Sequence, residues 1–332
     1  MIISRTPFRI SFFGGGTDYP VWYNENGGSV ISASINKYCY ITCRYLPPFF
    51  GYKYRIVYSR RDEVHNIEDI THPSAKECLA FVDIDKGVEI HHDGDLPART
   101  GLGSSSSFTV GLLNALQALK GKMVTKRQLA LDAIYVEQER IKEHVGSQDQ
   151  VIVSFGGFNK ITFARGHDIE VQPITLSAEK LDYFQSHLML FFTGFSRTAS
   201  EIAREQIEQT PSKKKELKEM QEMVDAALGV LNNNKESYEE FGKLLDETWR
   251  LKRSLTSKIS NPAIDEIYDA ARRAGATGGK LLGAGGGGFM LFFASPDMQP
   301  KIRQALEKLL YVPFKFDRQG SQIIYYGPER QD

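Results

Sequence analysis

The sequence predicts an α+β fold divided into two domains, and three observations lead to this prediction. The chain has 332 residues, which exceeds the roughly 250–300 residues at which a single hydrophobic core stops growing. Strand-like runs dominate about the first ninety residues, whereas long helical patterns alternate with strand-like runs in the second half. We therefore expect an N-terminal domain over residues 1–175, a C-terminal domain over residues 176–332, and a cleft between them.

The first part of the chain is predicted to be led by a sheet. Residues 9–13, 39–43 and 54–58 are short β-branched or aromatic runs bounded by Gly, Pro and Asn, which is the pattern of strands.

Two helices are predicted to follow. Apolar residues recur at helical spacing from Phe108 to Leu119, and Gly121 comes next as a terminator. The second helix is expected from about Lys126 to Glu143, where a broken apolar stripe runs through a charged segment.

The second half is predicted to combine helices with strands. A helical pattern runs over residues 200–231 and resumes near Glu236. A third helix is expected to begin with Asn261 as its N-cap and Pro262 in its first turn, and to end at Gly275. The last predicted elements are a buried strand over residues 289–293, an amphipathic helix over 296–310 and a strand over 323–326.

Composition argues against several kinds of partner. The 41 basic residues equal the 41 acidic ones, so no overall field attracts the chain to nucleic acid or to an anionic membrane. Cys39, Cys43 and Cys78 are odd in number and lack CxxC spacing, which argues against a disulfide framework and a zinc site. No stretch approaches the roughly 18 apolar residues of a membrane helix, and the start lacks a signal-cleavage pattern. We expect a soluble, unprocessed cytoplasmic protein.

Three glycine-rich stretches are candidates for ligand binding: residues 14–18 (GGGTD), 101–107 (GLGSSSS) and 283–288 (GAGGGG). The second runs into a predicted helix, so its backbone N–H groups and the positive end of the helix dipole would face an anion. Glycines let the main chain approach phosphate oxygens, and serine hydroxyl groups bind phosphate or Mg²⁺. On the residues alone, a serine-rich capped turn is an equally good interpretation.

Two common nucleotide-binding motifs are excluded. Gly283, Gly285 and Gly288 have the spacing of the dinucleotide fingerprint, but they run into a strand instead of opening a helix. A backbone bend that packs against another loop or a bound ligand fits this stretch better. The P-loop pattern GxxxxGK[ST] is absent from the sequence.

Taken in order, these segments resemble the three signatures of the galactokinase, homoserine kinase, mevalonate kinase and phosphomevalonate kinase (GHMP) superfamily. Residues 7–19 (PFRISFFGGGTDY) resemble the N-terminal motif, which contacts sugar in galactokinase-like members. Residues 97–107 (PARTGLGSSSS) resemble the ATP phosphate loop, and residues 280–289 (KLLGAGGGGF) resemble the glycine loop beside it. The resemblance implies an N-terminal domain like domain 2 of ribosomal protein S5 and a ferredoxin-like C-terminal domain.

Two departures from the superfamily pattern narrow the substrate class. Ser106 stands where alanine is usual, and GGGTD replaces the GEHTD of galactokinases. Together with residues 193–197 (TGFSR), these features look most like D-glycero-D-manno-heptose 7-phosphate kinases, which phosphorylate the anomeric hydroxyl group. Kinases for fucose and related sugars share much of the pattern.

The resemblance implies catalytic roles that the residues alone leave open. Asp149 matches the aspartate beside the acceptor hydroxyl group and is assigned as general base, and Arg9 matches the arginine that approaches the transferring phosphoryl group. Glu139 resembles the glutamate that binds Mg²⁺, with Ser105 as its hydroxyl partner and Glu137 as the alternative. Without the resemblance, a turn aspartate, a surface ion pair and a solvated helix face would explain these residues.

The resemblance also implies binding residues. Gly15, Gly16, Thr17 and Asp18 would contact the sugar, and Arg197 would grip a distal phosphate group with both arms of its guanidinium. ATP would contact the other two glycine-rich segments, through Pro97, Gly101, Leu102, Gly103, Ser104, Ser105, Ser106, Ser107, Gly285 and Gly286.

The resulting prediction is a sugar kinase that uses ATP and Mg²⁺ to convert D-glycero-D-manno-heptose 7-phosphate to the 1,7-bisphosphate. Two alternatives stay open: a kinase for another free sugar, such as a fucose- or galactose-like one, and a catalytically silent sensor that binds sugar and ATP. ATP turnover with candidate sugars separates the enzyme from the sensor. We expect a sugar or sugar-phosphate partner and no nucleic acid or membrane, and a homodimer is compatible with the sequence.

Overall fold

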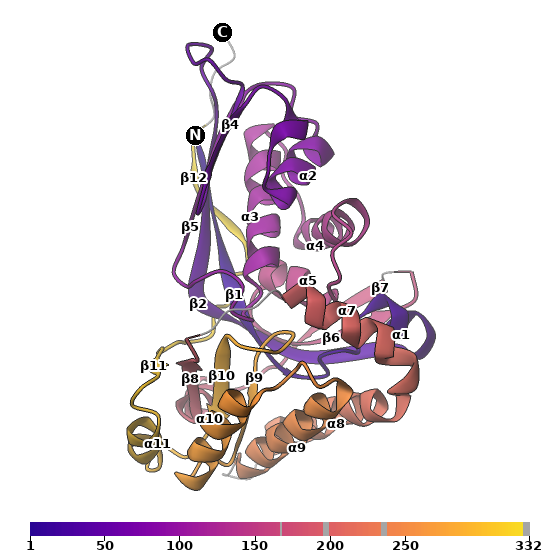
Figure 1. Ribbon diagram of the computed structural model, residues 1–332, viewed down its shortest axis with the longest axis vertical. Helices are drawn as coiled ribbons and strands as arrows, with labels where there is room; N and C mark the ends of the chain where they lie inside the picture. Colours follow the sequence, from indigo (N-terminus) through magenta and orange to yellow (C-terminus); the bar gives the residue numbers. More distant parts are fainter. Residues whose placement is uncertain (167, 195–198, 234–237, 328–332) are drawn as a thin grey trace.

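The computed structural model describes residues 1–166, 168–194, 199–233 and 238–327 (Figure 1). Within these ranges the chain forms two sheets with helices packed against them, which confirms the predicted α+β class. Arg197 lies outside the described residues.

The first sheet contains eight strands within the described residues and follows the order β12-β1-β2-β5-β3-β4, with β6 paired to β2 and β7 to β6. Neighbouring strands are antiparallel except β3 and β5, which are parallel. The three strands predicted in this part are confirmed, and the first two continue well beyond the predicted runs. The bounds are β1 (Ile2–Phe13), β2 (Gly28–Tyr45), β3 (Tyr54–Val57), β4 (Arg61–Val64), β5 (Val88–Gly94), β6 (Phe158–Ala164), β7 (Asp168–Pro173) and β12 (Gln322–Tyr326).

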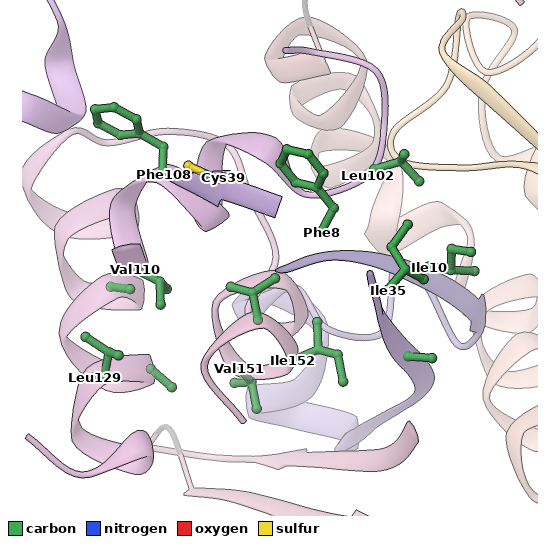
Figure 2. Packing of buried hydrophobic residues seen from close by; sticks show 14 of the residues in the cluster. Phe8, Ile10, Ile35, Cys39, Leu102, Phe108, Val110, Leu129, Val151 and Ile152 are labelled. Atoms are coloured by element: carbon green, nitrogen blue, oxygen red, sulfur yellow. The ribbon is translucent and has the colours of Figure 1, made fainter. Parts of the chain in front are cut away.

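Helices α2 (Pro73–Val82), α3 (Ser104–Leu119), α4 (Lys126–Tyr135) and α5 (Gln148–Phe155) lie on one side of the long strands (Figure 1). The main hydrophobic core fills the space between them, and it includes Ile10 and Ile35 of the strands, Val110 of α3 and Ile152 of α5 (Figure 2). Leu102, from the glycine-rich stretch before α3, is 1% exposed and belongs to the same core. The core therefore anchors this stretch by its one large apolar side chain.

The second sheet has the order β11-β8-β10-β9. The continuous apolar run at residues 289–293 forms β10 with all five side chains buried, as predicted. The bounds of the strands are β8 (Leu188–Phe192), β9 (Gly278–Leu281), β10 (Phe289–Phe293) and β11 (Leu310–Tyr311). Helices α8 (Lys214–Asn232), α9 (Glu239–Leu255), α10 (Pro262–Arg273) and α11 (Gln299–Ala305) lie around this sheet in the lower part of Figure 1.

The third predicted helix begins as expected. The Asn261 side chain accepts hydrogen bonds from the backbone N–H groups of Ala263 and Ile264, both at 3.1 Å, and Pro262 opens α10. This N-cap satisfies two donors that the helix itself leaves without partners.

Several predicted helix boundaries were wrong. α3 begins at Ser104, before Phe108, because Gly103 takes a left-handed conformation and the serines form the first turn. The helix expected to reach Glu143 ends as a π-helical turn over Val136–Arg140. The pattern over residues 200–231 is divided into α7 (Ala199–Gln209) and α8 by a short 3₁₀ turn that contains a proline. The helix expected over residues 296–310 is limited to α11.

The last strand connects the two halves of the chain. β12 pairs with β1 in the first sheet, with Ile2 opposite Tyr326. The C-terminal segment therefore returns to the N-terminal sheet. The boundary between residues 175 and 176 stays a prediction, since the division into domains rests on the sequence alone.

Candidate active site

A cleft lies where the end of β1, the N-terminus of α3 and the glycine-rich turn after β9 come together. Side chains of α5, α7 and α9 line the same cleft. Both sheets contribute to it through β1 and β9, so the predicted cleft is present.

Arg9 and Asp149, which both line this cleft, form a bidentate ion pair. The Arg9 Nε donates to Asp149 Oδ1 at 2.7 Å, and its Nη2 donates to Oδ2 at 2.5 Å. The third guanidinium arm, Nη1, donates to the Gly101 carbonyl oxygen at 2.7 Å. The Arg9 side chain is 5% exposed and the Asp149 side chain 22%. The structure thus brings together the two residues predicted to be catalytic, and it leaves the carboxylate accessible from the cleft.

The serine-rich stretch forms the first turn of α3 and lines the cleft. Gly103 is the N-cap of α3 with a positive φ of 76°, and a Cβ there would lie 3.4 Å from Asp149 Oδ2. Ser104, Ser105 and Ser106 line the cleft in the first turn, where backbone N–H groups have no intrahelical partners. By contrast, the Ser107 hydroxyl group is buried and donates to the carbonyl oxygens of Pro7 and Gly103, so it holds the turn in place.

The third glycine-rich stretch packs directly against the second. A Cβ on Gly101 would lie 2.3 Å from the Leu282 carbonyl oxygen, and one on Gly283 would lie 2.4 Å from the Gly101 Cα. Only glycine allows this approach. Gly283 lines the cleft. The two glycines predicted to contact ATP pack against Ile259 instead: the Gly286 backbone N–H donates to the Ile259 carbonyl oxygen, and a Cβ on Gly285 would meet the Ile259 backbone.

The glycine-rich turn after β1 places Asp18 beside the ion pair. Asp18 Oδ1 accepts from the Gly16 backbone N–H at 2.9 Å, and Oδ2 accepts from that of Gln148 at 3.4 Å. Burial raises the pKa of the Asp18 carboxyl, and the nearby Asp149 charge raises it further. The buried Thr17 hydroxyl group lies near the carbonyl oxygens of Gly14 in the turn and of Ser29 in β2, to which it donates. Thr17 therefore fastens the turn to β2, while Gly15, Gly16 and Asp18 face the cleft.

The two candidate metal-binding glutamates lie in different environments. Glu139 is exposed and is not among the residues that line the cleft. Glu137 is fully buried, and its Oε2 accepts from the Ser106 hydroxyl group at 2.9 Å and from the Gln150 amide. Burial, with the Glu143 charge as a second cause, raises the pKa of Glu137 to about 7. The structure therefore pairs Glu137 with Ser106, and it does not pair Glu139 with Ser105.

The protein supplies few ligands for a metal ion. Within the described ranges, no cluster of three or more His, Cys, Asp or Glu side chains is arranged to hold one. Glu137 Oε1 makes no hydrogen bond of ordinary geometry to the described residues, although the Thr109 hydroxyl lies close enough to lower the pKa of the carboxyl. One carboxylate and one hydroxyl group suit Mg²⁺ that arrives with a phosphate ligand, because Mg²⁺ keeps several waters.

Sequence reasoning missed two buried lysines in the cleft. Lys252 of α9 is 6% exposed and Lys280 of β9 is 2% exposed. The Lys252 ammonium donates to the Gly283 carbonyl oxygen, and that of Lys280 donates to the Phe12 carbonyl oxygen at 2.8 Å. A signal was present in each case: Lys252 interrupts the apolar side of a helix, and Lys280 stands in a fully buried strand.

The surroundings of Lys252 oppose its charge. Burial is the main cause that lowers its pKa, to about 8, and the neighbouring Arg9 guanidinium adds to the effect. Asp18 and Asp149 act in the opposite direction. An anion that enters the cleft would meet an ammonium group that is already desolvated. This group lies beside the close backbone contact of Gly101 with Gly283, which we call the glycine junction.

Comparisons with known proteins agree with this geometry. The family model "GHMP kinases N terminal domain" matches residues 71–157, and "GHMP kinases C terminal" matches residues 226–312. A D-glycero-alpha-D-manno-heptose 7-phosphate kinase of Campylobacter jejuni is 27% identical over 96% of this chain and 97% of its own length. A bifunctional fucokinase/GDP-fucose pyrophosphorylase of Arabidopsis thaliana is 24% identical over 91% of this chain but only 31% of its own.

A solved structure supports the same fold. The crystal structure of a D-glycero-D-manno-heptose 1-phosphate kinase from Bacteroides thetaiotaomicron has a TM-score of 0.77 and 23% identity, over 98% of this chain and 99% of that one. The predicted two-domain GHMP kinase fold is confirmed. No helix within the described residues is both long and apolar enough to cross a membrane.

Replacing Lys252 with Met should separate stability from activity. The ordinary pKa of lysine is 10.5, whereas that of buried Lys252 is about 8. The free-energy cost of burying this charge is therefore fully present below pH 8, and it disappears as the pH rises to 10.5. Lys252→Met should therefore stabilise the protein by on the order of 2 kcal/mol at pH 7 and by less at pH 10, while kcat/KM falls. Urea unfolding at both pH values measures this, with the exposed Lys215→Met as control. A variant destabilised at pH 7 would contradict the argument.

Proposed function

Because this chain belongs to the GHMP kinase family, we propose that it transfers the terminal phosphoryl group of ATP to the anomeric hydroxyl group of D-glycero-D-manno-heptose 7-phosphate. The chain is a phosphotransferase of the sugar-kinase type. The observation that carries the chemistry is the position of Asp149, held by Arg9 directly beside the N-terminal turn of α3. The acceptor is proposed from the relative in Campylobacter jejuni, which matches over nearly the full length of both chains.

Asp149 would act as the general base. Its carboxylate would accept the proton of the anomeric hydroxyl group as that oxygen forms a bond to the γ-phosphorus and the bond to the bridging oxygen of ADP breaks. Arg9 fixes the orientation of the carboxylate by two parallel hydrogen bonds. Positioning of this kind contributes much of the acceleration, because phosphoryl transfer needs little covalent chemistry from the protein.

The negative charge of the ATP phosphates would be neutralised by the N-terminal turn of α3 and by the cations Arg9 and Lys252. The first turn of α3 presents backbone N–H groups to the phosphates of ATP, with the helix dipole behind them. Arg9 and Lys252 each donate to a carbonyl oxygen of the glycine junction, Gly101 and Gly283 respectively. Both cations are thereby held where negative charge develops during transfer.

Glu137 and Ser106 would hold Mg²⁺, with Ser105 close by in the same turn. When bound with ATP, Mg²⁺ neutralises charge on the phosphate oxygens. We propose Glu137 in place of Glu139 because Glu137 is buried against the cleft-lining Ser106, whereas Glu139 is exposed.

A kinase for another sugar is the second candidate. The fucokinase relative matches over 91% of this chain at 24% identity, which favours a fucose-like acceptor as the main alternative. A silent sensor is disfavoured, because Asp149 keeps a partly exposed carboxylate beside the N-terminal turn of α3, and binding alone needs no proton acceptor there.

Asp149→Asn should lower kcat by roughly 10²- to 10⁴-fold, because the amide has the same shape but accepts no proton at neutral pH. The affinity for ATP should stay nearly unchanged. Steady-state kinetics and nucleotide titration measure the two effects, with the exposed Asp168→Asn as control. A variant that keeps more than half of the wild-type kcat would remove Asp149 from the mechanism.

Glu137→Gln should raise the Mg²⁺ concentration that gives half-maximal activity. We expect an increase of at least roughly 10- to 100-fold, the loss of metal affinity that follows when a group supporting a metal ligand is removed. Glu139→Gln should leave it unchanged, because its carboxylate is in solvent. Titration of activity with Mg²⁺ at saturating ATP distinguishes the two. The opposite ranking would restore the original assignment of Glu139.

The acceptor experiment tests the proposed function itself. The enzyme should prefer the heptose 7-phosphate to the unphosphorylated heptose, fucose and galactose, and Arg197→Ala should erase most of that preference. A charge-assisted grip on the distal phosphate contributes about 1.5–3 kcal/mol, equivalent to roughly 10- to 150-fold in kcat/KM. The measurement is kcat/KM for each acceptor with the product's phosphate position fixed by NMR, and the exposed Arg204→Ala is the control. If a free sugar wins, the heptose-phosphate assignment fails and the sugar-kinase assignment stands.

A further inference from the structure

Two buried polar atoms in the cleft have no hydrogen-bond partner within the described residues. They are Ser11 Oγ and Gln148 Oε1, whose residues are 6% and 9% exposed. Both residues line the cleft. Most buried polar groups in proteins are paired, and leaving one unpaired lowers the stability of the fold. These two atoms therefore point to a polar ligand.

The space between them is left open by Gly15. A Cβ on Gly15 would lie 3.9 Å from Ser11 Oγ and 4.0 Å from Gln148 Nε2. The backbone of Gly15 is not in the left-handed region, so its conformation would accept another residue. What glycine provides at this position is room beside the two polar side chains.

The open space lies on the acceptor side of the cleft. Ser11 and Arg9 are two residues apart on β1, so their side chains leave the same face of the strand. Gln148 precedes Asp149 at the start of α5, and its backbone N–H donates to Asp18. Both unpaired atoms thus flank the carboxylates proposed to hold and deprotonate the sugar.

A neighbouring side chain closes the other side of this space. A Cβ on Gly16 would lie 2.6 Å from Gln206 Nε2, so the amide of Gln206 occupies the room that a side chain at position 16 would need. Gln206 of α7 is buried and lines the cleft. The turn after β1 is therefore filled at position 16 and left open at position 15.

We propose that Ser11 and Gln148, on either side of the space left by Gly15, hydrogen-bond hydroxyl groups of the acceptor sugar and set the selectivity for that sugar. The inference rests on the proposed function, since it concerns the acceptor of that same site. A hydroxyl group both donates and accepts, so it satisfies the Ser11 hydroxyl and either atom of the Gln148 amide. A site whose polar groups are buried discriminates strongly against a sugar that lacks the matching hydroxyl, because they are then left unpaired.

The test uses three variants in the cleft and two matched controls. Ser11→Ala and Gln148→Met remove the polar atoms, and Gly15→Ala fills the space with a methyl group at ordinary contact distances. Ser154 is the control for Ser11, because its buried hydroxyl group also lacks a hydrogen-bond partner in the described part of the chain but lies outside the cleft. Gly229 is the control for Gly15, because a Cβ there meets nothing within 4 Å and its φ is not in the left-handed region.

Each cleft variant should lower kcat/KM for the acceptor by about 3- to 10-fold, the size expected for one neutral hydrogen bond, and should leave the Kd of ATP unchanged. The Ser154→Ala and Gly229→Ala variants should match the wild type in both measurements. Ser11→Ala should also raise Tm, because it removes a buried hydroxyl group that has no hydrogen-bond partner among the described residues. A residue with only a structural role would not combine a higher Tm with a lower kcat/KM.

Deoxy analogues of the acceptor identify the hydroxyl groups. One analogue should lack the hydroxyl group that Ser11 binds, and for it the wild type and Ser11→Ala should have equal kcat/KM. A second analogue should lack the hydroxyl group that Gln148 binds, and for it the wild type and Gln148→Met should have equal kcat/KM. The inference is overturned if the cleft variants stay within twofold of the controls, or if every variant loses the same factor on all analogues. If the wild type prefers a sugar other than the heptose 7-phosphate, the proposed function fails, and the same series on that sugar decides the inference.

Discussion

The Arg9–Asp149 ion pair holds together the three segments that form the cleft. The guanidinium joins the end of β1 to the start of α5 through Asp149, and it reaches the phosphate loop through the Gly101 carbonyl oxygen. Gly101 in turn touches the backbone of Gly283, in the loop that follows β9 of the second sheet. A cation, a carboxylate and a contact between two glycines therefore set the relative positions of the nucleotide loop and the proposed base. Because Arg9 is almost buried, loss of its partner would leave an uncompensated charge.

The cleft gathers groups that lower the stability of the empty protein. Lys252 is buried as a cation against another cation, and its pKa falls to about 8 as a result. The carboxyl of Asp18 is buried beside a second carboxylate, which raises its pKa. Ser11 and Gln148 carry buried polar atoms that find no hydrogen-bond partner in the described ranges. Such costs are usual where a ligand completes the interactions, because the groups are arranged for the bound state and not for the free one.

Local patterns were sufficient for much of the fold and part of the site. The apolar run at residues 289–293, the N-cap Asn261 and the strand-like first segments predicted their elements, because each depends on residues close together in the sequence. The three glycine-rich segments also pointed to the cleft, since glycine permits backbone contacts that other residues exclude. Arg9 and Asp149 were selected through the family resemblance, and the structure brings them together although 140 positions separate them.

The sequence by itself determined the α+β class, several of the helices and strands, and the three glycine-rich segments that line the cleft. Only the tertiary structure decided which glutamate lies beside the serine turn of α3: within the π-helical turn over Val136–Arg140, Glu137 is buried against Ser106 and Glu139 is exposed. The entry of Lys252 and Lys280 into the cleft and the return of β12 to the first sheet were likewise decided by packing between distant segments. Side-chain direction and long-range pairing are set by contacts that a local pattern does not contain.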